Sequence, residues 1–460
     1  MNLRQSIIKV FFANLLQLFT SIIVGFFVPA VLSVDAYASL RTYTFYITYV
    51  GFLHLGFVDG MYIKYGGKNP TENDKGILKG EHRFFFIFQT IVSVVIAGIA
   101  ILIGNVLWLL IGLSVILING YSFHKMYYQA TGQFSKYTGY AYAYSLVYLA
   151  LNVLLAVILK NKDANLYCLT TVIANLVVLL VLEGSFYKNF HRTRAIYDKK
   201  GIRNNISVGF FVLLGNLSVT MFYAIDQWFV KFGMTTDDFA YYSFAISLLN
   251  MVTVLVNAVT ITFYNYLARE KNDEKLRNIK KYLVILGSLA SFGYFPLAFI
   301  IDFFLEKYIP ALSVISISFA AYPYMIVINA IYVNLYKVQK DERKYLWSVV
   351  KMLIVAIIYN IIGMLIWNNI ESIAFATTFS FITWYFYAMR HFPALKSDWK
   401  ELLYLCLVLI SFLLCSHISN YFIGAVIYLI ILIVGIVLFF KDLLKASVIK
   451  GFIFGIRQKK

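Results

Sequence analysis

Charged side chains are rare inside the long apolar stretches of this sequence, and those that occur there are the first candidates for chemistry. Asp226 lies well inside an apolar run, where an ionised carboxylate costs about 2.5 to 3.5 kcal/mol at the centre of a bilayer. Such a group indicates either coupling to a cation such as Na⁺ or H⁺, or an internal salt bridge or protonated structural carboxyl. Lys351, in another run, is equally consistent with ligand binding and with snorkelling to the membrane interface.

Two basic residues, Arg41 and Lys231, stand at the ends of apolar runs and have the chemistry to bind an anion. Arginine offers a planar fork that can donate to two phosphate oxygens, whereas lysine offers a point charge. We predict that these side chains flank a phosphate on the outward-facing half of a transport route. In the alternative interpretation Arg41 is structural, capping the second helix and pairing with Asp35.

Uncharged polar residues recur at helical spacing within the apolar runs. At 100° per residue, Asn14 and Gln17 lie on one face of the helix predicted over residues 7–32. The helices predicted over 42–61, 206–232 and 239–265 carry similar stripes. From these faces and the charged positions we predict Asp226 as the ion-coupling residue and the following substrate-binding residues: Asn14, Gln17, Arg41, Thr48, Asp59, Asn216, Gln227, Lys231, Asn250, Asn257 and Lys351.

The polar stripes admit two interpretations. In the first, Asn, Thr and Gly hold helix against helix, at roughly 0.6 kcal/mol per hydrogen bond. In the second, the stripes line a hydrated cavity between two halves of the protein. Contacts between helices do not require Arg41, Asp59 and Lys231 on the same faces, so the residue types favour the cavity. Exposure to lipid is excluded in either case, because hydrocarbon does not solvate polar groups.

Composition and run length predict the elements that carry these residues. Of 460 residues, 61% are hydrophobic and 13% charged, which indicates a multi-pass membrane protein rather than a chain of soluble domains. Fourteen apolar runs are each long enough to cross about 30 Å of hydrocarbon as a helix. They cover residues 7–32, 42–61, 84–103, 106–123, 138–159, 165–187, 206–232, 239–265, 282–301, 309–336, 345–367, 372–390, 401–417 and 422–440. We therefore expect an all-α fold of about fourteen transmembrane helices.

The sequence also indicates an internal duplication. A shift of 202 residues places Asn216 on Asn14 and residues 237–240 on residues 35–38, with long apolar runs on either side. Each copy holds six predicted crossings, an even number, so both copies face the same way and are related by a pseudo-twofold axis along the membrane normal. The expected organisation is one six-helix bundle over 1–203, a second over 204–400, and two further helices with a basic tail over 401–460.

The net charge of +18 is explained by membrane sidedness, without a nucleic-acid partner. When successive runs alternate across a bilayer, most of the 40 Lys and Arg residues fall on the side of the N-terminus. Because cytoplasmic loops are enriched in basic residues, we expect both termini in the cytoplasm and the protein in the cytoplasmic membrane. Arg41 and Lys231 are among the few basic residues on the opposite side. The enrichment of basic residues in cytoplasmic loops therefore does not explain their presence.

The sequence lacks the motifs of several classes of chemistry. It contains no Gly-x-x-x-x-Gly-Lys-Ser/Thr loop, no His-Glu-x-x-His and no Gly-x-Ser-x-Gly. The longest gap between runs, residues 62–83, is too short for a soluble catalytic domain. Cys168, Cys406 and Cys415 lie in apolar runs without metal-ligand spacing. We expect no enzymatic activity, no cofactor and no metal site.

Two local segments, with the duplication and the two extra C-terminal helices, resemble a known family. Residues 56–67 (GFVDGMYIKYGG) and 127–137 (YYQATGQFSKY) are similar to segments of the Wzx-type oligosaccharide flippases, within the multidrug/oligosaccharidyl-lipid/polysaccharide exporter superfamily. The resemblance implies two bundles that open alternately around a cationic cavity. It also implies a substrate, an undecaprenyl-diphosphate-linked oligosaccharide repeat unit for capsule, O-antigen or another surface polysaccharide, whose lipid tail stays in the bilayer.

Two other functions stay open at this point. A drug or cation antiporter of the same superfamily would use a membrane carboxylate, which Asp226 could supply. A membrane polysaccharide polymerase or glycosyltransferase would need a long outer loop with catalytic residues, and every predicted outer loop is short. For a flippase, the expected partners are the lipid-linked oligosaccharide, membrane lipids, a coupling Na⁺ or H⁺, and the polymerase and glycosyltransferases that handle the same substrate.

Overall fold

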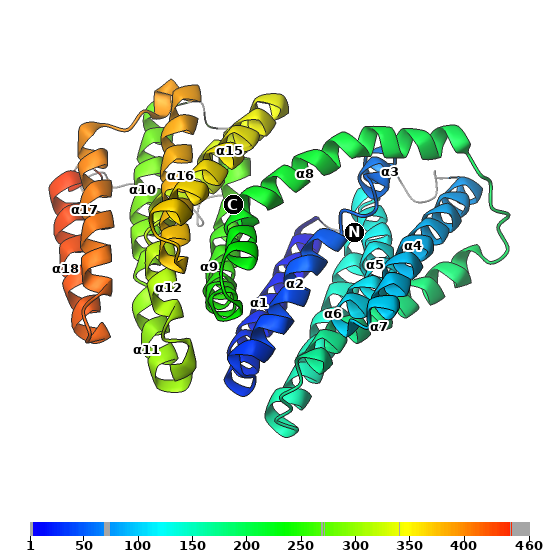
Figure 1. Ribbon diagram of the computed structural model, residues 1–460. Helices are drawn as coiled ribbons and strands as arrows, with labels where there is room; N and C mark the ends of the chain where they lie inside the picture. The colour runs from blue at the N-terminus through cyan, green and yellow to red at the C-terminus, as the bar shows by residue number, and fades with distance from the viewer. Residues whose placement is uncertain are drawn as a thin grey trace. The chain divides into compact units, whose positions relative to one another are not determined.

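The structure is a computed structural model that describes residues 3–68, 74–267, 270, 272–339, 341–441 and 443. Every regular element in these residues is a helix (Figure 1). By length and composition, ten of the described helices could each cross a membrane, or eleven if one pair bent by 46° counts as a single span. These findings confirm the predicted all-α, multi-pass membrane protein.

The chain divides into two compact units, residues 1–220 and 221–460. The division falls inside one long helix, α8 (Lys199–Gly233), so that its first part belongs to unit 1 and its last part to unit 2. The bundle boundary predicted after residue 203 lies near the start of the same helix. The two units are described separately below.

The described residues of unit 1 form seven helices and the first part of α8. They are α1 (Leu3–Val31), α2 (Val34–Val50), α3 (Phe57–Tyr65), α4 (Lys75–Ile103), α5 (Val106–Ala130), α6 (Phe134–Val153) with a π-helical turn at Leu154–Ile158, and α7 (Ala164–Phe190). Local sequence signals set several of these ends. Between α4 and α5, Gly104 adopts a left-handed conformation with φ 70°, and the Asn105 side chain accepts a hydrogen bond from the Trp108 N–H.

Unit 2 contains the last part of α8 and the helices that follow it. They are α9 (Thr236–Leu267), α10 (Asp273–Ser291), α11 (Tyr294–Phe304), α12 (Ala311–Phe319), α13 (Tyr322–Val327), a π-helical turn at Ile328–Tyr332, α14 (Val333–Val338), α15 (Glu342–Ile366), α16 (Ile370–His391), α17 (Trp399–Ser416) and α18 (Tyr421–Phe439). A buried ion pair fixes the start of α17 against α10, because Lys280 Nζ lies 2.8 Å from Glu401 Oε1 and both side chains are fully buried.

The second apolar run differs from its prediction. A single helix was expected over 42–61, but α2 begins at Val34, ends at Val50, and is followed by a turn before α3. Leu55 (φ 51°) and Gly56 (φ 82°) both adopt the left-handed conformation in this turn, which an α-helix cannot accommodate. The N-terminus of α2 is set by Ser33, whose hydroxyl accepts a hydrogen bond from the Ala36 N–H.

Helix boundaries follow the predicted duplication at one junction. The α1–α2 junction, between Val31 and Val34, coincides after a shift of 202 residues with the α8–α9 junction, between Gly233 and Thr236. The copies then differ, since α9 continues to Leu267 where the first copy breaks into α2 and α3. The second copy has Ala258 at the position corresponding to Gly56. Duplication and its axis stay predictions.

Reporter fusions test the predicted sidedness of the helices. We expect an alkaline phosphatase fusion to be active, and a green fluorescent protein fusion dark, after Leu32, Lys160, Thr235 and Ile370. The reverse is expected after Lys75, Lys199 and Lys275, because basic residues are enriched in cytoplasmic loops. All seven positions are in the described part of the chain, at or close to helix ends. The topology would be wrong if both groups reported the same side.

Candidate functional site

The predicted site residues are distributed over both units. Unit 1 contains Asn14, Gln17, Arg41, Thr48, Asp59 and Asn216, and unit 2 contains Asp226, Gln227, Lys231, Asn250, Asn257 and Lys351. Arg41 and Lys231 therefore belong to different units, and their predicted cooperation on one phosphate stays a prediction. Asn257 lies in α9, but its side chain is outside the described residues.

The uncharged polar faces of unit 1 are exposed. Asn14 and Gln17 on α1, Thr48 on α2 and Asn216 on α8 all have exposed side chains. The Thr48 hydroxyl donates to the Thr44 carbonyl of its own helix (3.0 Å), and neither Asn14 nor Gln17 forms a side-chain hydrogen bond with another described residue. Asn216 makes one long contact, with Asp59 at 3.5 Å. These side chains do not form the network expected if their role were to hold helices together.

Arg41 lies in the second turn of α2, and its environment does not match the alternative interpretation, in which it caps the helix. Ser33 caps the helix, and no ion pair between Arg41 and Asp35 occurs in the described part of the chain. The guanidinium carbon lies 6.0 Å from the centroid of the Tyr37 ring. Its Nε atom is buried and has no hydrogen-bond partner among the described residues. Buried polar atoms are satisfied in the great majority of cases, so this nitrogen is suited to an acceptor from a ligand.

Asp59 is not on the polar face of α2, contrary to the prediction, because the turn at 51–56 places it on α3. It is buried, and its two carboxylate oxygens face different neighbours. Oδ2 lies 3.8 Å from His54 Nε2, and Oδ1 lies 3.5 Å from Asn216 Nδ2. His54 is also buried and accepts a hydrogen bond at Nδ1 from the Gly56 N–H, as a neutral packed histidine would. The structure thus brings two predicted site residues, Asp59 and Asn216, close together.

Asp226 is the most enclosed charged residue among the predicted site positions of unit 2, with 2% of its surface exposed. Its Oδ2 accepts hydrogen bonds from Tyr242 Oη (2.7 Å) and Thr377 Oγ1 (3.3 Å), and its Oδ1 accepts one from the Gln227 N–H (2.7 Å). No Lys, Arg or His side chain forms an ion pair with it in the described part of unit 2. The salt-bridge alternative therefore has no partner there, and a coupling or protonated carboxyl stays open.

The remaining unit 2 positions are more accessible. Gln227 and Lys231 on α8 are half-buried, and Lys231 Nζ lies 4.5 Å from the centroid of the Phe239 ring. Asn250 on α9 is exposed. Lys351 on α15 is also exposed, and its Nζ donates to Tyr387 Oη at 3.1 Å. The interactions of Lys351 leave both ligand binding and snorkelling open.

The two family-like segments pack together at one end of unit 1, a contact that the sequence did not indicate. The Gly67 N–H donates to the Ala130 carbonyl (3.1 Å), and the Tyr65 and Tyr127 rings meet edge to face at 5.5 Å. Glu81, fully buried on α4, accepts hydrogen bonds from Lys64 Nζ (2.7 Å), Tyr65 Oη (2.7 Å) and Asn205 Nδ2 (2.8 Å). Sequence reasoning missed Glu81 because it precedes the apolar run predicted to begin at residue 84.

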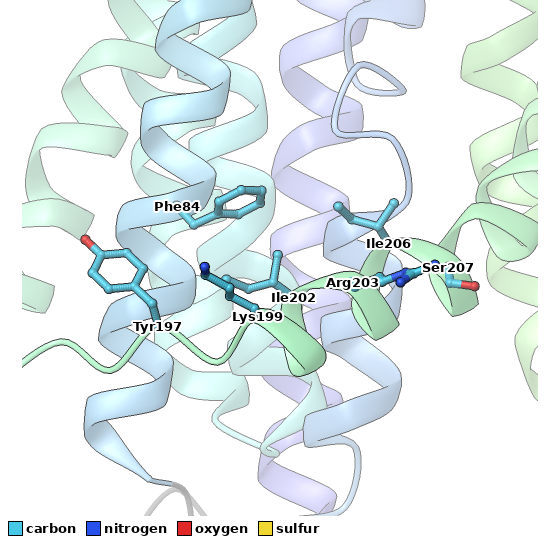
Figure 2. A pocket seen from close by; sticks show the side chains of 7 residues that line it. All are labelled: Phe84, Tyr197, Lys199, Ile202, Arg203, Ile206 and Ser207. Carbon is cyan, nitrogen blue, oxygen red and sulfur yellow. The ribbon is translucent and has the colours of Figure 1, made fainter.

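A groove of about 620 Å³ lies between α4 and the start of α8 (Figure 2). Figure 2 shows the side chains that line it: Phe84, Tyr197, Lys199, Ile202, Arg203, Ile206 and Ser207. None of the sequence-predicted site residues contributes to this groove. It is a separate feature of unit 1, with an apolar wall and two basic side chains.

Comparison with known proteins places the fold. No protein-family model and no curated protein matches the sequence. Among solved structures, lipid II flippase MurJ in an inward closed conformation matches with a TM-score of 0.73, over 96% of this chain and 100% of that chain, at 15% identity. The chain therefore shares the fold of that protein. An inward-facing multidrug resistance MATE family transporter of the MOP superfamily also matches, with a TM-score of 0.55, over 85% of this chain and 98% of that chain, at 12% identity.

Proposed function

We propose that the protein is a flippase that moves an undecaprenyl-diphosphate-linked oligosaccharide repeat unit from the cytoplasmic to the outer leaflet by alternating access. The observation that carries the proposal is Arg41, a half-buried cation on a helix with a polar face, whose Nε has no hydrogen-bond partner among the described residues. A diphosphate supplies the anionic acceptors that such a guanidinium lacks. The product would serve the assembly of capsule, O-antigen or another surface polysaccharide, with a polymerase and glycosyltransferases as partners.

The fold supports this class of substrate. A flippase for lipid II matches the chain over nearly its full length, and that substrate, like the proposed one, is carried by a lipid. The exposed amides and hydroxyls of Asn14, Gln17 and Thr48 offer hydrogen bonds to sugar hydroxyls without requiring a fixed charge pattern. A mixed surface of one cation and several neutral polar groups suits a head group with one diphosphate and many hydroxyls.

Energy for transport would come from an ion gradient, in keeping with the absence of nucleotide motifs in the sequence. Asp226 is the proposed coupling group, since its carboxylate is buried and hydrogen-bonded to hydroxyl and amide donors alone among the described residues. Binding of Na⁺ or H⁺ would neutralise a charge that is costly within the membrane. Conformations that differ in access to Asp226 would then differ in ion affinity, which is the requirement for coupling.

The same carboxylate supports a second candidate, a drug or cation antiporter, and the MATE-like fold is consistent with it. An antiporter would exchange organic cations for ions and would have no need of Arg41 as an anion-binding residue. A polymerase is the least supported alternative, because the sequence shows no long outer loop for catalysis. Transport assays with both substrate types separate the two transporter classes.

The test is flipping in proteoliposomes that contain the purified protein. We expect lipid-linked oligosaccharide to reach the opposite leaflet without ATP, and an imposed Na⁺ or H⁺ gradient to accelerate it. Asp226→Asn should reduce the response to the gradient by at least about fivefold, the lower end of the usual range for coupling between two sites. Asp302→Asn, which changes an exposed carboxylate of α11, should leave the response unchanged. A requirement for ATP hydrolysis would contradict the mechanism, and exchange of organic cations without oligosaccharide flipping would favour the antiporter.

A further inference from the structure

Three residues from three helices of unit 1 converge on one point. His82 is on α4, His124 on α5 and Glu183 on α7. The Nε2 atoms of both histidines approach the same carboxylate oxygen, Glu183 Oε1, at 2.9 Å from His82 and 2.6 Å from His124. The three potential ligand atoms all lie within 4.8 Å of one another. Glu183 is therefore engaged by two imidazoles.

The surrounding side chains hold the two imidazole rings in place. The His82 ring stacks between Phe86 (4.3 Å between ring centroids) and Phe186 (4.1 Å). Only 9% of His82 and 1% of His124 is exposed. Packing of this kind fixes the direction of both Nε2 atoms before any ligand binds, which reduces the entropy that binding would cost.

Glu183 is the most accessible member of the cluster. Its side chain is 32% exposed, whereas the side chains of His82 and His124 are 11% and 2% exposed. The cluster is thus closed by imidazoles on its inner side and open at the carboxylate. An ion could enter there, and a water molecule could occupy a further coordination position.

The ligand set suits a borderline transition metal. Two imidazole nitrogens and one carboxylate oxygen are the protein ligands of many three-ligand zinc sites, with Zn–N and Zn–O bonds of about 2.0 to 2.2 Å. Tetrahedral bonds of that length separate ligand atoms by roughly 3.3 Å, so the N–O distances of 2.9 and 2.6 Å would have to widen by about 0.4 and 0.7 Å. Mg²⁺ and Ca²⁺ are poor alternatives, because both prefer ligand sets made of oxygen alone.

We propose that His82, His124 and Glu183 form a binding site for a divalent transition metal, with Zn²⁺ as the best match, that ties α4, α5 and α7 together. The metal would replace the protons that the two imidazoles otherwise donate to Glu183. The sequence predicted no metal site, because the three ligands lie in different helices without any ligand spacing. The site is distinct from the polar faces and from Asp226, and it does not depend on the proposed transport function.

Metal binding to the purified full-length chain tests the site. After treatment with a chelator, the wild-type protein in detergent should bind one Zn²⁺ tightly, and Co²⁺ in its place should give the absorption bands of a four-coordinate site. Removal of second-shell groups weakens metal sites by 10- to 100-fold, so loss of two ligands in His82→Gln/His124→Gln should weaken Zn²⁺ binding by at least about 100-fold. His191→Gln, at an exposed histidine of the same unit, is the matched control and should bind as the wild type does.

Thermal unfolding shows whether the variants are folded. Glutamine can still donate a hydrogen bond to Glu183, so the metal-free double variant should unfold at a temperature close to that of the metal-free wild type. Zn²⁺ should raise the unfolding temperature of the wild type and of His191→Gln, since a ligand stabilises the state that binds it. It should not raise that of His82→Gln/His124→Gln. Equal Zn²⁺ affinity in the double variant and the wild type would overturn the proposal, as would a bound metal without imidazole ligands in X-ray absorption spectra.

Discussion

Replacement of Arg41 by alanine is expected to lower the flipping of lipid-linked oligosaccharide by at least about tenfold, at unchanged abundance of folded protein. A hydrogen bond to a charged group contributes about 1.5 to 3 kcal/mol, and 1.4 kcal/mol corresponds to a factor of ten. Arg41 has no ion pair to lose among the described residues, and its Nε has no hydrogen-bond partner there. The substitution should therefore cost substrate binding and little stability. The measurement is flipping in proteoliposomes, with accumulation of the substrate in the inner leaflet of cells.

Two further variants define how Arg41 acts. Arg41→Lys keeps the charge but loses the planar fork, so its activity should lie between those of the wild type and Arg41→Ala. Arg83→Ala removes an exposed arginine of α4 in the same unit and should leave flipping intact. Normal surface polysaccharide in cells that carry Arg41→Ala at wild-type abundance would contradict the proposed role. It would assign Arg41 a structural function instead.

Local sequence signals were sufficient for most of the helices. The predicted runs 84–103 and 106–123 leave a break at Gly104 and Asn105. The structure shows how these two residues act there, Gly104 in a left-handed conformation and Asn105 as the cap of α5. The break between α2 and α3 was not predicted, because the apolar composition continues through it. One of the two left-handed residues is Leu55, a residue type that seldom adopts this conformation and therefore gives no sequence signal.

Helical periodicity is the signal by which the sequence groups the candidate site residues. Asn14 and Gln17 were assigned to one face of a helix, and both are exposed on α1. Contacts between distant segments carry no periodic signal. The hydrogen bond from Asn205 to Glu81 spans 124 residues of sequence and that from His82 to Glu183 spans 101. The alternative in which Arg41 caps the second helix and pairs with Asp35 assumed a helix that begins at residue 42. The helix instead begins at Val34 with Ser33 as its cap, so Arg41 and Asp35 both lie inside it.

Glycines on both sides allow the first part of α8 to approach the segment 56–67 at backbone distance. A Cβ atom added to Gly60 on α3 would lie 1.9 Å from the Asn205 carbonyl oxygen on α8, and one added to Gly209 on α8 would lie 1.8 Å from the Gly56 carbonyl oxygen. The first part of α8 crosses the same end of unit 1 as α3 (Figure 1). Both clashes involve main-chain atoms, which cannot rotate away as a flexible side chain would.

Gly60→Ala is therefore expected to destabilise unit 1 by about 1 to 3 kcal/mol or more, the range for overpacked interiors. The helix α8 has to move away from α3, and this movement stretches the 2.8 Å hydrogen bond from Asn205 to the buried carboxylate of Glu81. Gly139→Ala is the matched control, because an added Cβ there has no atom within 4 Å. In the α6 helix it should stabilise by up to about 1 kcal/mol. Equal thermal stability of the two variants in detergent would show that the close approach of α8 does not constrain residue 60.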